Sequence, residues 1–240
     1  MTLRENEANQ EHWNSLGARY SGVWQTRARR RFSSRELSFI SGCCPTLPGG
    51  YLDIGCGNGR ILTLHDILAP SGARLAGIDI AENMLAVCRE IPFTHQTAFF
   101  RADIALDGLP AEAKGPFVFI TAIRSLKYNQ AWRDAFRLLA SSLAPGGVFV
   151  MNMPNARSLN IFGRYAIPFY RTTQGELRAL AGECGLEIIG FRGFSRIPDV
   201  FYRFNGRFWD WLLAAGEAVL ECVFGRRLFH RELFIALKRA

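Results

Sequence analysis

The residues best suited to chemistry are a glycine-rich turn and an aspartate downstream of it. The stretch YLDIGCGNGR, residues 51–60, places Gly55, Gly57 and Gly59 on alternate positions after a short apolar run. Glycines let a ligand approach the backbone closely, and the N–H groups of a helix beginning there attract an anion. Asp79 lies 20 positions after Gly59, at the end of an expected strand, where a carboxylate can accept both hydroxyls of a ribose. The pattern therefore predicts a nucleoside-containing ligand in preference to a bare phosphate.

Two other nucleotide-binding loops fit this turn poorly. The dinucleotide fingerprint GxGxxG requires its third glycine at position 60, where the chain has Arg60, and a pyrophosphate would lie against that side chain. The phosphate-binding motif GxxxxGK[ST] does not occur in the sequence. A nucleotide-dependent oxidoreductase is therefore retained only as a rival enzyme class.

The elements that must position these residues follow from the apolar pattern. Short β-branched or aromatic runs alternate with helical patterns between residues 50 and 153, which is typical of βαβ units on a parallel sheet. Helices are expected to begin near Arg60 and to cover 81–90 and 130–143, and a fourth is expected to end at Gly185. Strands are expected at 51–54, 73–80, 97–104, 117–123, 148–153, 186–193 and 231–239. The spacing predicts an α/β fold.

Five motifs occur in order along the chain: LDIGCGNGR, GIDIAENML, RADI, FITAIRSL and LAPGGVFVMNMPN. With them the sequence resembles the class I S-adenosylmethionine-dependent methyltransferases, of the small-molecule type, over about residues 13–195. The resemblance implies a Rossmann-like, seven-stranded, mostly parallel sheet with helices on both faces. Its last strand would be antiparallel and inserted between the fifth and sixth. The implied cofactor is S-adenosyl-L-methionine, lying across the C-terminal ends of the strands.

The resemblance also implies a set of cofactor-binding residues. Asp79 would hold the ribose hydroxyls and Asp103 would bond the adenine amino group; the alternative for each is that it caps the next helix. Thr121 and Ala122 would line the floor beneath the sulfonium, and Tyr20 could meet the cofactor carboxylate. The full set is Tyr20, Gly55, Cys56, Gly57, Asp79, Ile80, Met84, Asp103, Ile104, Thr121 and Ala122.

A general base is the least defined part of the expected site. The sulfonium methyl is already activated, so a base is needed only where the acceptor must lose a proton. Some members of the family have a histidine just after the fourth strand, whereas this chain has RSLKY at 124–128. His12 and Tyr128 are the candidates, and Arg124 is either an anchor for a substrate anion or part of a surface ion pair.

We expect one methyltransferase domain over 1–240, with a cofactor-binding core at 50–153. The N-terminal region, 1–42, is expected to form a helical cap that folds over the cofactor, and 154–173 a cap loop. A helical insertion is expected at 195–230, before the last strand. Its apolar residues recur every three or four positions between arginines, which suits a lid, a core helix or an interfacial helix contacting acidic lipid through 201–227. Its uncharged run is shorter than the roughly 20 residues of a membrane span.

The composition of the chain limits the classes of binding partner. The 29 Lys and Arg outnumber the 21 Asp and Glu, for a formal net charge of +8, and arginines crowd both ends of the chain. Such a field suits nucleic acid, acidic lipid or an anionic substrate. Nucleic acid is unlikely because the fourth strand is not followed by Asn/Asp-Pro-Pro-aromatic. Six cysteines without a CxxC pair and four isolated histidines predict no metal site. Without an N-terminal apolar segment, the expectation is a cytoplasmic protein, peripheral to a membrane at most.

The sequence thus predicts methyl transfer to an O or N atom of a small, apolar or aromatic, biosynthetic metabolite. One alternative is a methyltransferase acting on a lipid-linked acceptor at the membrane surface. Another is a non-catalytic nucleoside-binding protein of the same fold. The oligomeric state is not predicted.

Overall fold

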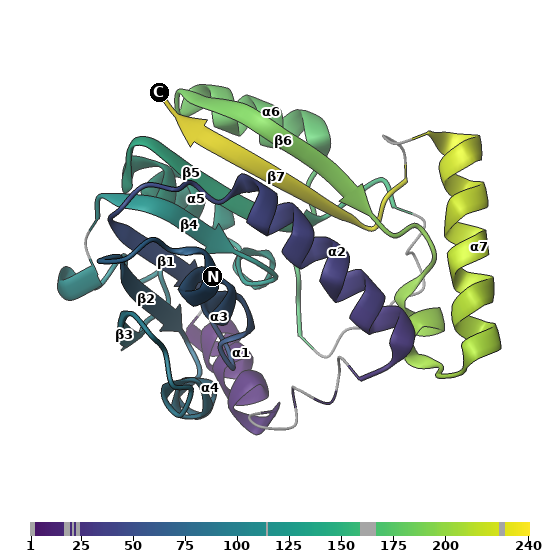
Figure 1. Cartoon of the computed structure of the whole chain (residues 1–240), viewed down its shortest axis with the longest axis horizontal. Coiled ribbons are helices and arrows are strands. Elements are labelled where there is room, and N and C mark those ends of the chain that lie inside the picture. Colours follow the sequence, from purple (N-terminus) through teal and green to yellow (C-terminus); the bar gives the residue numbers. More distant parts are fainter. Residues whose placement is uncertain are drawn as a thin grey trace.

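The protein is organised around a seven-stranded sheet, seen here in a computed structural model that describes residues 3–16, 20, 22, 25–113, 115–158, 167–225 and 229–240. The strand order is β3-β2-β1-β4-β5-β7-β6 (Figure 1). The strands are β1 Gly50–Ile54, β2 Arg74–Asp79, β3 Gln96–Arg101, β4 Phe117–Ala122, β5 Leu143–Pro154, β6 Leu186–Phe194 and β7 Glu232–Arg239.

The strand directions confirm the predicted fold class. Neighbouring strands from β3 to β5 pair in parallel, whereas β7 lies antiparallel between β5 and β6. The strand bounds agree with the expected ranges to within one residue, except that β3 ends at Arg101 and not at residue 104, and β5 begins at Leu143 and not at residue 148. Leu143 already pairs with Phe117 before the register shifts, so the stretch APGG, expected to form a turn, lies inside the strand.

Helices cover both faces of the sheet because successive residues of each buried strand point to opposite sides. In β5, Phe149 and Met151 pack with α5 (Trp132–Ser141) and α6 (Gln174–Glu183) in one hydrophobic core. Val148 and Val150 pack in a second core on the other face. That core also holds residues of α2 (Arg27–Cys43), α3 (Arg60–Leu68) and α4 (Glu82–Arg89).

The N-terminal region contains two helices. The first, α1 (Leu3–Leu16), lies against α4 and near the end of β2 (Figure 1). There Gln10 Nε2 donates to the carbonyl oxygen of Ile80 at 3.2 Å. Thr26 caps the second helix, α2, by accepting from the N–H of Arg29, as hydroxyl side chains commonly do at a helix start.

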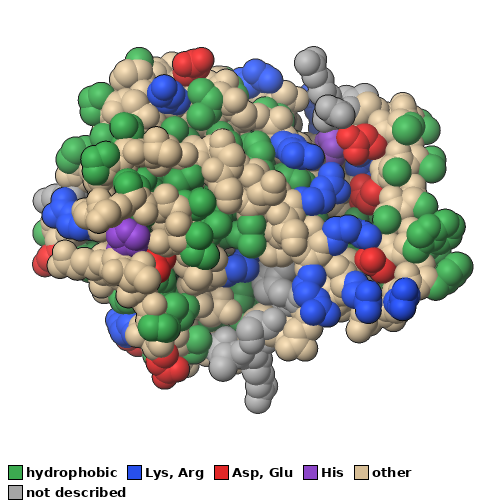
Figure 2. Space-filling model, in the orientation of Figure 1, with side chains coloured by type: hydrophobic (Ala, Val, Ile, Leu, Met, Phe, Trp, Pro, Cys, Tyr) green, Lys and Arg blue, Asp and Glu red, His purple; other side chains and the backbone are tan. Residues whose placement is uncertain are grey.

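The helical insertion consists of a short helix, η4 (Asp199–Arg203), and α7 (Arg207–Phe224). Figure 1 shows α7 at the far side of α2 from the sheet, and Figure 2 shows hydrophobic side chains along this outer edge. Leu213 is the buried residue of α7, so α7 is not a core helix. No helix within the described ranges is long and apolar enough to cross a membrane.

Candidate active site

The first of two adjoining cavities lies at the C-terminal ends of β1 to β4, beneath α1. Its walls combine backbone, carboxylates, amides and apolar side chains. The lining residues are Asn9, Trp13, Tyr20, Ile54, Gly55, Gly57, Ile78, Asp79, Ile80, Met84, Ala102, Asp103, Ile104, Ala105, Ile123, Arg124, Ser125, Leu126, Tyr128 and Asn129. Eight of the eleven predicted cofactor residues are therefore brought together around one space.

The glycine turn is fixed to the end of β2 by Asp79. One carboxylate oxygen accepts from the N–H of Gly57 at 2.8 Å and the other accepts from the N–H of Ala81 at 2.9 Å. Burial raises the pKa of Asp79, and the N–H groups of Ala81, Gly57 and Ile80 oppose that rise. The carboxylate is thus oriented at the cavity wall, with oxygen lone pairs left to accept from a ligand.

The close approach at this turn depends on glycine. Gly55 has a φ of +70°, and a Cβ added there would lie 2.4 Å from Cβ of Ser125, so a side chain would clash with the loop after β4. At Gly57 an added Cβ would meet only the carbonyl oxygen of Gly55, at 3.9 Å. The space beside Gly57 is therefore open to a ligand atom.

A second carboxylate faces the cavity from the end of β3. Asp103 accepts from the N–H of Ala105 at 3.0 Å and from Nδ2 of Asn129 at 3.0 Å. Burial raises the pKa of Asp103. The apolar side chains of Ile80, Met84 and Ile104 also line the space. Two carboxylates with an apolar slot between them suit an adenosine, whose ribose and amino group donate and whose base is flat.

Three predicted residues lie outside this lining. Cys56 is only 4% exposed, and its pKa is raised well above the usual range by a hydrogen bond with Cys88 and by burial. Thr121 and Ala122 are fully buried, and Thr121 donates its hydroxyl proton to Asp53 at 2.7 Å. The cavity floor after β4 is made by the next three residues, Ile123, Arg124 and Ser125.

The aromatic rings of Trp13, Tyr20 and Tyr128 form part of the cavity wall. The ring of Trp13 lies edge-on to Tyr20 and to Tyr128, with centroid distances of 5.8 and 5.2 Å. Asn9 Nδ2 donates to the carbonyl oxygen of Tyr128 at 3.0 Å. Of the two candidate bases, Tyr128 lines the cavity and His12 does not.

A second cavity opens beside the first and shares Trp13, Tyr20, Arg124 and Tyr128 with it. Its walls come from segments far apart in the chain and are rich in arginine. The lining residues are Trp13, Tyr20, Arg29, Phe32, Arg124, Lys127, Tyr128, Pro154, Ser158, Phe169, Arg171, Asp199, Tyr202, Arg231 and Glu232. Of the expected cap loop, 159–166 lies outside the described residues, while Pro154, Ser158, Phe169 and Arg171 contribute to this wall. No residue of α7 lines either cavity in the described part of the chain, so α7 is not a lid.

Arg124 connects the two cavities. Its φ is +62°, an unusual conformation for a residue with a side chain, and its N–H donates to Oδ1 of Asn152 at 2.6 Å. Its guanidinium pairs with Glu36, which is fully buried. The sequence offered a surface ion pair as one alternative for Arg124; the structure shows an ion pair, but a buried one, at the wall of both cavities.

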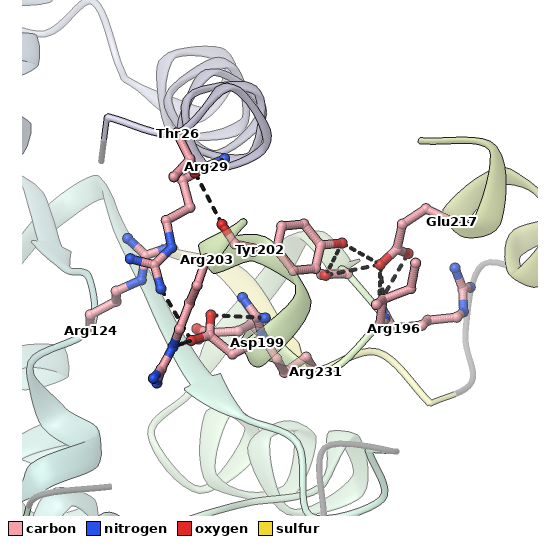
Figure 3. Close-up of polar contacts among 12 residues, drawn as sticks. Thr26, Arg29, Arg124, Arg196, Asp199, Tyr202, Arg203, Glu217 and Arg231 are labelled. Atoms are coloured by element: carbon pink, nitrogen blue, oxygen red, sulfur yellow. Dashed lines mark hydrogen bonds and ion pairs between the residues drawn. The ribbon is translucent and has the colours of Figure 1, made fainter. Parts of the chain in front are cut away.

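The carboxylates of the second cavity are held by several cations. Asp199 pairs with Arg29 at 3.3 Å, Arg231 at 3.2 Å and Arg203 at 3.7 Å (Figure 3). Burial alone would raise the pKa of Glu232, but Lys127, Arg124 and Arg231 lower it below its usual range. The sequence did not point to Asp199 or to Glu232. The only signal in the sequence for this cavity was the crowding of arginines at both ends of the chain.

The chain belongs to the methyltransferase domain family, which matches residues 25–215. This match and the sheet confirm the predicted class, an S-adenosylmethionine-dependent methyltransferase. In the described ranges, no three His, Cys, Asp or Glu side chains are grouped so that they could hold a metal ion.

Curated relatives and a solved structure are similar over different lengths. Ubiquinone biosynthesis O-methyltransferase of Albidiferax ferrireducens is 28% identical over 61% of this chain and 58% of its own length. Its namesake in Bordetella avium is 26% identical over 82% of this chain and 87% of its own length. Trans-aconitate 2-methyltransferase of an Acidovorax species is 32% identical over 55% of this chain and 50% of its own length. The structure of magnesium protoporphyrin IX methyltransferase from Synechocystis with bound SAH superposes with a TM-score of 0.65 at 16% identity, covering 98% of this chain and 100% of that one.

Proposed function

We propose that the protein transfers the methyl group of S-adenosylmethionine to an oxygen or nitrogen atom of a small acceptor that carries a negative charge. The observation that carries the proposal is the sharing of Trp13, Tyr20, Arg124 and Tyr128 by the two cavities. A donor in the first cavity and an acceptor in the second would meet at these side chains. Direct transfer requires such a meeting, because the nucleophile must be aligned with the methyl group.

The first cavity has the groups that an adenosine requires. Asp79 would accept from the ribose hydroxyls, and Asp103 from the adenine amino group. Ile80, Met84 and Ile104 would contact the base. The sulfonium supplies a methyl group that is already activated, so the residues around it mainly exclude water and fix the orientation of the reactants.

The lining of the second cavity limits the chemical class of the acceptor. Its lining holds five cations, Arg29, Arg124, Lys127, Arg171 and Arg231, against two carboxylates, Asp199 and Glu232. Including the buried partner of Arg124, Glu36, cations still outnumber carboxylates by five to three. The aromatic rings of Phe32, Phe169 and Tyr202 also line the cavity. This combination favours an acceptor with an apolar or aromatic body and an anionic group, which guanidinium groups recognise well.

Arg171 is the side chain best suited to test the charge of the acceptor. It is exposed and lies over the ring of Phe169 at 5.1 Å, so its removal should cost little stability. Arg171→Gln should raise the KM for the acceptor about tenfold, the effect of losing one charge-assisted hydrogen bond. Arg101 is also exposed but lies outside both cavities, and Arg101→Gln is the matched control.

The charge of the acceptor can be tested before the acceptor is identified. The protein is incubated with methyl-labelled S-adenosylmethionine and a metabolite extract, and the small products are separated on an anion exchanger. We expect label in a retained product with wild type and the Arg101→Gln control, and less label with Arg171→Gln at low acceptor concentration. An uncharged labelled product that is not a methyl ester would contradict the anionic acceptor. Binding of S-adenosylmethionine without any transfer would favour the non-catalytic alternative.

A further inference from the structure

The outer face of α7 is apolar and exposed to solvent. Phe208, Trp211, Leu212, Val219 and Val223 have exposed fractions of 73, 63, 42, 61 and 67%. With Ala215 between Leu212 and Val219, members of this set recur at three or four residues, which places them on one side of the helix. An exposed stripe of large apolar side chains is uncommon on a monomeric protein and marks an interaction surface.

The acidic residues of α7 lie on the opposite side and bind the rest of the protein. Asp210 pairs with Arg31 of α2 at 3.0 Å. Glu217 accepts from the N–H groups of Arg196 and Ile197, at 2.8 and 2.9 Å, and from the hydroxyl of Tyr202 at 2.5 Å (Figure 3). An ordinary surface helix turns its apolar side to the core and its charges to water. Here the arrangement is reversed, and specific polar contacts maintain it.

The surroundings of the apolar face are basic. Arg203 at the end of η4 and Arg207 at the start of α7 are exposed. Arg27 and Arg30 are exposed on α2, the helix that packs against α7. Figure 2 shows Lys and Arg side chains grouped beside this edge of the molecule. The outer face itself, formed by Phe208, Trp211 and the apolar residues in register with them, has no acidic residue.

We propose that α7 is an interfacial helix that binds a membrane surface containing anionic lipids. Its apolar side chains would enter the boundary between headgroups and acyl chains, and the flanking arginines would contact lipid phosphates. An 18-residue helix is about 27 Å long, long enough to lie in the plane of the surface. A second copy of the protein is disfavoured as the partner, because pairing through α7 would bring two basic rims together in a chain of net charge +8.

The second cavity lies close to this helix along the chain. The short helix η4 supplies Asp199 and Tyr202 to that cavity and lies directly before α7 in the chain. Membrane binding through α7 would therefore hold the acceptor cavity close to the lipid surface.

Vesicle flotation tests the proposal. The full chain is mixed with vesicles of phosphatidylcholine alone or of phosphatidylcholine with phosphatidylglycerol, at low and at high salt. We expect flotation with the anionic vesicles at low salt and weaker flotation at high salt, because salt screens the arginine contacts. The variant Phe208→Ser/Trp211→Ser/Val219→Ser should lose at least about tenfold in vesicle partitioning.

Two controls make the result decisive. Ile67→Ser removes an apolar side chain that is 72% exposed on α3 and should float like wild type. The thermal shift with S-adenosylmethionine should be the same for wild type and the triple variant, which shows that both are folded. The proposal would be overturned by absence of flotation with anionic vesicles, by equal flotation of the triple variant, or by equal flotation with neutral vesicles. A wild-type dimer that the triple variant converts to a monomer, without vesicle binding, would assign α7 to a second copy.

Discussion

The two cavities differ in how their acidic groups are held. In and beneath the first cavity, burial raises the pKa values of Asp53, Asp79 and Asp103, and the last two accept from backbone N–H groups. In the second, cations lower the pKa of Glu232. Glu36 is an exception, because burial outweighs Arg124 and Arg60 and raises its pKa. One fold can therefore provide carboxylates that accept hydrogen bonds from the hydroxyls of a methyl donor in one cavity. In the adjoining cavity it provides positive charge for an anion.

The largest effect is expected at Arg124, where the two cavities meet. Arg124→Met would leave Glu36 fully buried without its strongest counter-charge and should lower the free energy of unfolding by about 3–5 kcal/mol. Urea denaturation measures the loss. The double variant Glu36→Gln/Arg124→Met removes both charges and should recover at least half of it. A single variant as stable as wild type would mean that the ion pair does not hold α2 to the site.

The buried groups beneath the first cavity should give opposing pH dependences. Asp53 has a pKa raised to about 7 by burial, so its neutral form stabilises the fold below about pH 4 and that contribution is lost as pH rises through 7. His65 has a pKa lowered to about 3 by burial, so its contribution is present above about pH 6.5 and lost as pH falls. Between about pH 4 and 6.5 the two slopes oppose each other.

Replacing either Asp53 or His65 should leave the pH dependence that the other contributes to stability. Relative to wild type, Asp53→Asn should make stability rise more steeply with pH by up to about 1.4 kcal/mol per pH unit, and His65→Leu should change the slope by a similar amount in the opposite direction. Urea unfolding at several pH values between 4 and 6.5 measures both slopes. A slope in Asp53→Asn equal to that of wild type would show that Asp53 is ionised in the folded protein.

Tyr128 lies at the junction of the cavities, and its replacement tests whether it acts in proton transfer or only in binding. If its hydroxyl accepts the proton of the acceptor, Tyr128→Phe should reduce kcat about 100-fold, the lower end for general-base catalysis, and leave the affinity for S-adenosylmethionine unchanged. Steady-state kinetics and calorimetry measure the two quantities. An unchanged kcat would remove Tyr128 from proton transfer. The same comparison with His12→Phe, which lies outside both cavities, should show no change in kcat.

Local patterns predicted the fold and the donor side, because both depend on residues close together in sequence. Gly55, Gly57 and Asp79 are separated by one strand–helix–strand unit, so their meeting follows from parallel pairing alone. Thr121 was predicted to line the cavity, but residues two and three positions further along the chain line it instead. The last residues of β4 are buried within the sheet, and the chain reaches the cavity only at Ile123 and Arg124.

The acceptor side could not be predicted in the same way. Arg29, Arg171 and Arg231 reach one cavity from α2, the segment after β5, and the residue before β7, and no sequence spacing relates them. The outward orientation of α7 was equally hidden, because periodicity shows that a helix has an apolar side but not which way that side faces. The sequence offered a lid, a core helix or an interfacial helix. The linings of the two cavities argue against a lid, and the exposure of α7 argues against a core helix.

Binding of S-adenosylhomocysteine to wild type, Asp79→Ala and Arg171→Gln, measured by calorimetry, tests the assignment of the two cavities most directly. We predict that Asp79→Ala weakens binding about 100-fold, because both ribose hydroxyls lose a charged acceptor, and that Arg171→Gln binds like wild type. Full affinity in Asp79→Ala, or an equal loss in both variants, would contradict a donor held by Asp79 in a cavity separate from the arginines.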